Sequence, residues 1–299
     1  MNKLIKNTIY CFLLVVVLSY PMSFFISTNF NTYLKQNWIL KLKNMKLDYA
    51  VLGSSRVFNM VDIKSLDSTF NKKGINLGTS GSSYAENYVL LSEFLSKNNI
   101  SELILNIDEF CFNSKNSYSY PFHEYEFLPL SDKYNDVFLD YIPKWKSYLW
   151  KALPLTKYIE FNHQFVLKPN NLLDKNMGSL LLNETDENEG FGNTKFETKR
   201  SQAKISEVDK KYFLKIIQLC NSKNIKVILI TTPIYNYNHQ SFFSSYIKSI
   251  SQELNLRYYG FEGLMENNRI YFNDYTHTNK LGSIQYSINL GKKLKNNNE

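Results

Sequence analysis

Short apolar runs, separated by longer polar stretches, recur along the chain from Asp48 onwards. Each run is a few residues long and almost wholly apolar, as strands are when helices cover both faces of their sheet. The pattern therefore predicts a parallel sheet. The predicted strands are Tyr49–Leu52, Ile75–Leu77, Leu103–Ile107, Val227–Thr231 and Leu256–Tyr259.

Segments with apolar residues at helical spacing lie between these strands. They are Tyr84–Lys97, Glu207–Lys223, Phe242–Leu254 and Asn279 to about Lys295, and a further helix is expected from about Asp62. Strands that alternate with helices form βαβ units, so the sequence predicts an α/β fold.

The amino-terminal segment has a different pattern. Thr8–Ser27 is free of charged residues and long enough to cross a bilayer as a helix. Lys3 and Lys6 precede it, which predicts a cytoplasmic amino terminus and an extracytoplasmic remainder. We expect a single-pass anchor in the cell membrane, with Pro21 kinking or ending its last turns. A cleaved signal peptide is the alternative, but the run is long for one and no small-x-small site follows it.

Three parts follow from these patterns. Residues 1–27 form a cytoplasmic tip and transmembrane anchor, 28–47 a polar and partly helical stalk, and 48–299 the α/β domain. The domain carries an insertion at about 110–205, rich in aromatic and polar residues, which we interpret as a helical cap because structureless loops of that length are rare. Its aromatic side chains either stack on sugar rings or pack the cap onto the sheet.

Composition excludes several functions. The formal charge is +8, but Lys and Arg are spread along the chain among 27 acidic residues, so no nucleic-acid surface is expected. The three cysteines, Cys11, Cys111 and Cys220, show no CxxC spacing. We therefore expect no structural zinc site and no disulfide framework, and we interpret Cys111 and Cys220 as buried thiols. The serine chemistry considered below needs no metal and no organic cofactor.

Candidate chemistry begins where the first strand ends, at Gly53-Ser54-Ser55-Arg56. Open α/β sheets carry their sites at the carboxyl ends of strands, which places Ser55 where a nucleophile is needed. A serine also needs a base held in orientation by a third group. Asp274-Tyr-Thr-His277, before the last helix, offers such a pair. A Gly-Ser-Ser turn and an Asp-x-x-His spacing are each common in proteins. Their joint occurrence, after the first strand and before the last helix of one α/β domain, is uncommon.

Two neighbours of Ser55 complete the candidate site. Arg56 is interpreted as a substrate-binding charge, either an anchor for an acidic substrate or a replacement oxyanion donor, and Ser54 is assigned to substrate binding with it. The alternative is that Arg56 simply pairs with Asp62 or Asp108.

These motifs resemble those of the SGNH (GDSL-like) hydrolase superfamily, in particular its membrane-anchored branch of DltD-like and polysaccharide acetyltransferase-like proteins. The resemblance covers residues 48–108 and 225–290. Gly53-Ser54-Ser55 matches the first block with Ser in place of Asp, Asn76-Leu-Gly-Thr-Ser-Gly81 the second, and Asp274-Tyr-Thr-His277-Thr-Asn-Lys-Leu-Gly282 the last. It implies a flavodoxin-like three-layer α/β/α parallel sheet, the SGNH hydrolase fold.

The resemblance also implies roles. Ser55 would be the nucleophile, His277 the general base and acid, and Asp274 the residue that orients His277, while the N–H groups of Ser55 and Gly81 would form the oxyanion hole. It implies an extracytoplasmic serine esterase or O-acyltransferase that acts on an envelope glycan or another acylated polymer. A membrane-bound O-acyltransferase is an expected partner.

One block departs from the family pattern. The third block should supply an oxyanion-hole asparagine, but this chain has Leu105-Asn106-Ile107-Asp108 there. Asn106 is one residue out of place, and such a shift turns a side chain to the opposite face of a strand. Loss of one oxyanion donor costs about 100-fold or more in turnover.

Two further hypotheses therefore stay open. The first is a catalytically weak or inactive SGNH-like module that binds glycan or scaffolds a polysaccharide modification or export complex. The second is a flavodoxin-like binder of nucleotide or phosphate that uses Gly53–Arg56, although the chain has neither a Walker nor a dinucleotide glycine pattern.

Overall fold

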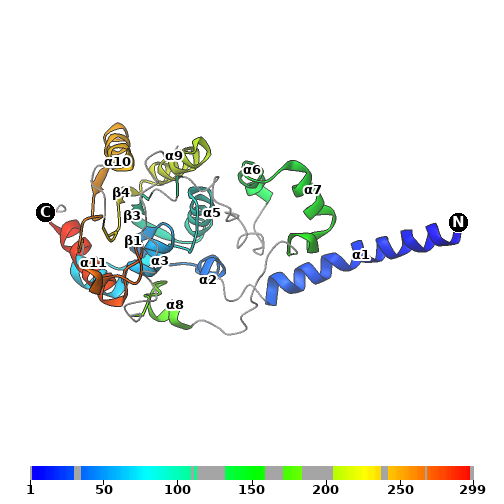
Figure 1. Cartoon of the computed structure of the whole chain (residues 1–299), viewed down its shortest axis with the longest axis horizontal. Helices are drawn as coiled ribbons and strands as arrows, with labels where there is room; N and C mark the ends of the chain where they lie inside the picture. The colour runs from blue at the N-terminus through cyan, green and yellow to red at the C-terminus, as the bar shows by residue number, and fades with distance from the viewer. Residues whose placement is uncertain are drawn as a thin grey trace. The chain divides into compact units, whose positions relative to one another are not determined.

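The structure is a computed structural model (Figure 1) and describes residues 2–29, 35–108, 111–112, 132–158, 171–183, 205–236, 242–266 and 268–296. The chain forms two compact units, one of residues 1–38 and 122–170, the other of residues 39–121 and 171–299.

The second unit is built on a five-stranded parallel sheet in the order β2-β1-β3-β4-β5. This is the flavodoxin-like strand order. The strands are β1 (Lys46–Leu52), β2 (Gly74–Asn76), β3 (Asn99–Asn106), β4 (Lys226–Ile230) and β5 (Arg257–Tyr259). All five predicted strands are confirmed, and so is the α/β fold class.

The central strands begin earlier than the apolar pattern indicated. β1 and β3 pair from Lys46 with Asn99 onwards, so the sheet includes residues that we had placed in the stalk. The first residues of both strands are largely exposed, whereas their last residues are buried. The apolar pattern therefore indicates only the buried part of each of these two strands.

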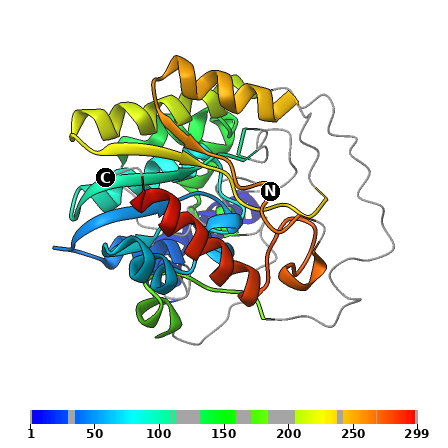
Figure 2. The ribbon, with the colours of Figure 1, turned by 90° about the vertical axis from the view of Figure 1, so that its left-hand side faces the viewer.

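Helices cover both faces of this sheet. One face carries α3 (Ser55–Met60), α4 (Ile63–Phe70) and α11 (Lys280–Lys295), and Figure 2 shows α11 lying across the strands. The other carries α5 (Tyr84–Leu95), α9 (Glu207–Ser222) and α10 (Phe242–Glu253). The unit is thus a three-layer α/β/α sandwich.

Each face has its own packed core. On the α11 face, Tyr49 and Val51 of β1 pack with Tyr286 and Leu290 of α11. On the opposite face the ring of Phe112 lies 5.4 Å from that of Phe213 in α9 and 6.0 Å from that of Phe243 in α10. Alternate strand residues supply the two cores, as the pleat requires.

The first helix after β1 differs from the prediction. We expected a turn at Gly53–Arg56 and a helix from about Asp62, and α4 does begin there, with Asp62 as its N-cap. A separate short helix, α3, precedes it and begins at Ser55. Ser54 caps α3 with its hydroxyl, which accepts the Arg56 N–H. Ser54 and Ser55 thus begin a helix and do not only form a turn.

The loop before α11 is held by two residues of the last block. Asn279 caps α11, accepts the Gly282 N–H at 3.0 Å and donates to the Ile270 carbonyl at 2.7 Å. A Cβ on Gly282 would lie 2.1 Å from the Tyr271 carbonyl oxygen. Only glycine lets α11 approach the 3-10 helix η6 (Arg269–Tyr271) this closely.

The first unit contains α1 (Asn2–Asn29), whose segment Lys3–Phe25 is long and apolar enough to cross a membrane. The helix continues past Pro21, so the expectation that Pro21 ends it is wrong. A proline removes one backbone hydrogen bond of an interior turn, and the helix tolerates this loss here. The stalk contains the expected helical part, α2 (Lys35–Lys41).

The described parts of the insertion are largely helical, as predicted. They contain η4 (Asp132–Tyr134), α6 (Asn135–Leu139), α7 (Lys144–Ala152), η5 (Pro154–Tyr158) and α8 (Asn171–Lys175). The segment after α8 joins the sheet unit, because the Met177 carbonyl accepts the Asn76 N–H. The aromatic cluster at Tyr118–Phe127 lies outside the described residues, and the role of the insertion as a cap stays a prediction.

Replacing Gly282 by alanine tests the close contact between α11 and η6. The new methyl group overlaps the Tyr271 carbonyl, so we expect the free energy of unfolding to fall by about 1–3 kcal/mol. Gln285→Ala, at an exposed position of the same helix, should change it by less than about 0.5 kcal/mol. Denaturant titration of the detergent-solubilised chain measures both, and equal values for the two variants would contradict the packing.

Candidate active site

Two side chains that are far apart in sequence meet at the carboxyl edge of the sheet. Ser55, the first residue of α3, follows β1, and His277 lies in the loop before α11. The Ser55 Oγ lies 2.9 Å from the His277 Nε2. This is the hydrogen-bonding distance expected from the sequence.

The other ring nitrogen of His277 faces Asp274. The His277 Nδ1 lies 2.9 Å from the Asp274 Oδ2 and 3.1 Å from its Oδ1. A tautomer with the proton on Nδ1 donates to the carboxylate and leaves Nε2 to accept the Ser55 hydroxyl proton. The three side chains thus form one hydrogen-bonded series with the geometry of a serine–histidine–acid triad.

The loop itself holds Asp274 in place. Its Oδ1 accepts the Thr276 N–H at 2.7 Å, the His277 N–H at 2.8 Å and the Thr276 hydroxyl at 3.0 Å. Burial by itself raises the pKa of Asp274, but the hydrogen bond and charge of His277 and the donors of Thr276 outweigh it, and the pKa falls from 3.8 to about 2. Asp274 is therefore an anion at neutral pH.

The two backbone N–H groups assigned to the oxyanion hole are those of Ser55 and Gly81. Ser55 lies in the first turn of α3, where the N–H has no partner within the helix. Gly81 lies on an exposed loop with a φ of 67°, a conformation that suits glycine. Within the part of the chain that the structure describes, neither N–H donates a hydrogen bond.

The loop that carries Gly81 is tied to the turn that carries Ser55. The Gly53 carbonyl accepts the Thr79 N–H at 3.1 Å and the Ser82 hydroxyl at 3.0 Å. A Cβ on Gly78 would lie 2.6 Å from Val57 of α3, so a side chain there would push the loop and the helix apart. The missing side chain of Gly78 therefore lets this loop pack against the start of α3.

A buried carboxylate lies beneath this turn. Asp108, which is 1% exposed, accepts the Ser54 hydroxyl at 2.8 Å, the Asn106 side-chain amide at 2.9 Å and the Cys111 N–H at 2.9 Å. These three donors compensate the cost of burying the charge. Asp108 thereby fixes the residue next to Ser55.

The hydrogen bonds of Asp108 contradict the expected role of Ser54 and agree with the expectation that Asn106 is not an oxyanion donor. Ser54 was assigned to substrate binding, but it is 2% exposed and its hydroxyl donates to Asp108, so a substrate does not reach it. Asn106 is fully buried and its amide also donates to Asp108, so it supplies no oxyanion donor.

Arg56 extends to the end of β4. Its Nη2 donates to the carbonyls of Thr232 and Pro233 at 3.3 and 3.4 Å. Among the described residues its Nε is buried with no acceptor, and no ion pair links it to Asp62 or Asp108. The alternative, in which Arg56 pairs with one of these carboxylates, is thus wrong, and part of this half-buried cation remains unsatisfied.

Sequence reasoning missed two residues that support the site. Thr276 binds Asp274 through both its N–H and its hydroxyl, and the only signal was a threonine just before the histidine. Asp108 was considered only as a partner of Arg56. Asp108 follows Asn106 by two residues, and alternate residues of an extended chain point to the same side. This spacing could have indicated the contact between the two side chains.

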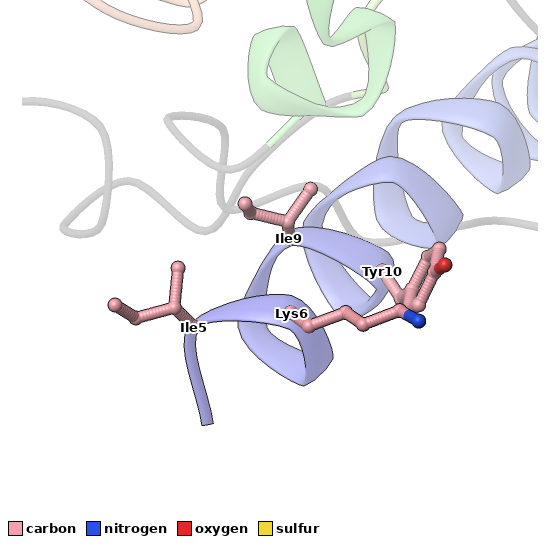
Figure 3. A pocket seen from close by; sticks show the side chains of 4 residues that line it. All are labelled: Ile5, Lys6, Ile9 and Tyr10. Atoms are coloured by element: carbon pink, nitrogen blue, oxygen red, sulfur yellow. The ribbon is translucent and has the colours of Figure 1, made fainter. Parts of the chain in front are cut away.

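Other candidate sites are few in the described ranges. They contain no group of three or more His, Cys, Asp or Glu side chains able to hold a metal ion. Cys111 and Cys220 are free and buried, as expected. A hollow lined by Ile5, Lys6, Ile9 and Tyr10 lies on the outer surface of α1 and includes none of the site residues (Figure 3).

Comparisons with known proteins give similarity at the level of structure alone. No family model and no curated protein matches the chain. A proposed acylhydrolase from Bacteroides fragilis is 11% identical, with a TM-score of 0.45 over 89% of this chain and 95% of its own. A GDSL-like lipase from Bacteroides thetaiotaomicron is 10% identical, with a TM-score of 0.41 over 84% and 88%. Likenesses at this level assign neither a family nor an activity to the chain.

Truncation of Asp108 tests the buried cluster. Asp108→Ala leaves three buried donors without an acceptor, so we expect the free energy of unfolding to fall by about 2–5 kcal/mol. Asp48→Ala removes an exposed carboxylate that accepts one N–H and should cost less than about 1 kcal/mol. Chemical denaturation compares the two variants, and a small loss for Asp108→Ala would show that the cluster does not hold the turn.

The lowered pKa of Asp274 predicts a pH dependence. Because its folded value of about 2 lies below the ordinary 3.8, ionised Asp274 stabilises the fold fully above 3.8 and loses this effect as the pH falls through about 2. The difference in unfolding free energy between the native chain and Asp274→Asn should therefore be constant near neutral pH and shrink in acid. Urea titrations at several pH values measure it, and a difference that grows in acid would contradict the assignment.

Proposed function

We propose that this chain is a membrane-anchored serine hydrolase of the SGNH type, an esterase or O-acyltransferase that acts outside the cytoplasm. The single observation that carries the proposal is the hydrogen-bonded series from Ser55 through His277 to Asp274. The three motif blocks that resemble the family lie around this series. The branch with DltD-like proteins is part of the proposal.

The geometry supports acyl transfer through a covalent intermediate. As the Ser55 Oγ attacks the carbonyl carbon of an ester, the His277 Nε2 takes its proton, and ionised Asp274 stabilises the imidazolium. The N–H groups of Ser55 and Gly81 receive the oxyanion. His277 then protonates the departing alkoxide, which leaves as an alcohol, and Ser55 carries the acyl group.

The second half of the reaction decides between hydrolysis and transfer. Water or a sugar hydroxyl gives its proton to the His277 Nε2 and attacks the acyl-serine, and Ser55 recovers its proton as it leaves. A tethered enzyme meets a membrane acyl donor at high effective concentration, which favours transfer to an envelope glycan. A membrane-bound O-acyltransferase fits as the source of that donor.

The reaction we propose is slow or selective. Asn106 and Asp108 are engaged with each other, so a third oxyanion donor comes from neither. Arg56 is the cation next to Ser55, and its side chain is only half-buried, which supports a role in binding an acidic group of the substrate. Asp108 beneath the site accepts three hydrogen bonds and is not placed to donate one to a developing oxyanion.

The missing third oxyanion donor also supports a second candidate function. Without the third donor, the chain fits a catalytically weak SGNH-like module that binds glycan or scaffolds a polysaccharide modification or export complex. This candidate keeps Arg56 as a binding residue and gives Ser55 no covalent role.

Labelling with a fluorophosphonate probe separates the two functions. We expect the full chain in detergent to be labelled, Ser55→Ala to show no labelling, and Ser68→Ala, which changes an exposed serine of α4, to be labelled like the native chain. Labelling that does not depend on Ser55, together with no acetate release from acetylated sugars, would favour the binding module.

Asp274→Asn probes the orienting role of the carboxylate. The amide favours the wrong tautomer of His277, so we expect the rate of 4-nitrophenyl acetate turnover to fall by up to about 10⁴-fold with little change in KM. The matched control is Asp136→Asn on α6, which changes an exposed aspartate outside the site. Equal rates for both variants would remove Asp274 from the mechanism.

A further inference from the structure

One face of α7 presents large apolar side chains that nothing in the described part of the protein covers. Trp145, Tyr148 and Leu149 are 65%, 68% and 38% exposed. Their spacing of three and four residues places them on one side of the helix. Isolated exposed apolar residues are common, but an aromatic group on one helix face is typical of a contact surface.

The charges of α7 are all positive. Lys144 and Lys151 are exposed at its two ends, and the helix contains no acidic residue. Lys146 points elsewhere: it is buried, and its ammonium lies 5.4 Å from the Trp150 ring. The exposed face thus combines aromatic rings with flanking cations, the composition of helices that lie on anionic membrane surfaces.

The end of α7 is fixed to the helix that can span a membrane. The Tyr20 hydroxyl of α1 donates to the Lys151 carbonyl at 2.7 Å, and α1 also contacts η5, the turn that follows α7. Ser19 and Ser23 of α1 are buried, whereas most of its large side chains are exposed. Small polar residues at a contact face, with apolar residues elsewhere, suit a helix surrounded by lipid.

The position of Tyr20 along α1 sets the depth of this contact. Tyr20 lies five residues before Phe25, the end of the apolar span. At 1.5 Å per residue it is about 8 Å inside that end, in the outer part of the acyl-chain region. Trp and Tyr side chains are enriched at the adjoining interface with the headgroups, within reach of a helix attached at this depth.

We propose that α7 is an interfacial helix that inserts Trp145, Tyr148 and Leu149 into the outer leaflet of the bilayer that α1 spans, with Lys144 and Lys151 at anionic lipid headgroups. This inference rests on the proposed anchoring by α1 and is independent of the Ser55 chemistry. The first unit then holds the membrane by one spanning helix and one in-plane helix, which prevents it from rotating freely about α1.

Lipid quenching of tryptophan fluorescence tests the proposal on the full chain. The chain is placed in nanodiscs of anionic phospholipid, with or without bromine atoms on the acyl chains. The emission of Trp145 is taken as the difference between the native chain and Trp145→Phe. We expect this emission to be blue-shifted, to be mostly lost in brominated lipid, and to resist aqueous iodide.

Two controls make the result specific. The difference between the native chain and Trp150→Phe gives the emission of Trp150, a ring of the same helix that lies beside Lys146. In brominated lipid this emission should lose less intensity than that of Trp145. The double variant Lys144→Glu and Lys151→Glu should weaken the lipid quenching of Trp145 in anionic nanodiscs and leave Ser55 labelling by fluorophosphonate unchanged.

Either of two outcomes overturns the proposal. If iodide and not brominated lipid quenches Trp145, the face is in water. If neither quencher reaches it, protein covers the face, for example a second copy of the chain. In both cases the chain that stays with the nanodisc still carries its α1 anchor, so failure of this inference is distinct from failure of the anchoring or of the active site.

Discussion

All five strands of the sheet run in one direction, and this constraint assembles the candidate site. Because parallel strands end at a common edge, residues that follow β1, β2 and β3 meet there, although long stretches of chain separate them. Ser55, Gly81 and Asp108 are such residues. The loop before α11 adds Asp274 and His277 at the same edge, and the cap formed by Asn279 and the absent side chain of Gly282 hold that loop in place.

The buried carboxylate of Asp108 gives this site its individual character. It accepts the hydroxyl of Ser54 and the side-chain amide of Asn106, so both residues are held beneath the turn that carries Ser55. The proposed acyl transfer is consistent with a serine whose neighbour is held in this way.

Most of the fold followed from the sequence because buried strands and amphipathic helices have distinct periods. The contact of Ser55 with His277 also followed, from where each motif falls relative to a strand or helix. The start of α3 at Ser55, the burial of Ser54 and the partners of Arg56 did not, because short helices and hydrogen bonds between distant segments leave no periodic signal. The apolar face of α7 was not predicted either. It lies in the insertion, whose aromatic residues indicated only stacking on sugar rings or packing against the sheet.

The central claim is that Ser55, activated by His277, forms a covalent acyl intermediate. Mass spectrometry of the chain after brief reaction with an acetyl ester tests this most directly. The account predicts one acetyl group on the peptide that contains Ser55, absent in Ser55→Ala and much reduced in His277→Ala. An acetyl group found on other residues alone, or equal acetylation of Ser55 in the His277→Ala chain, would contradict it.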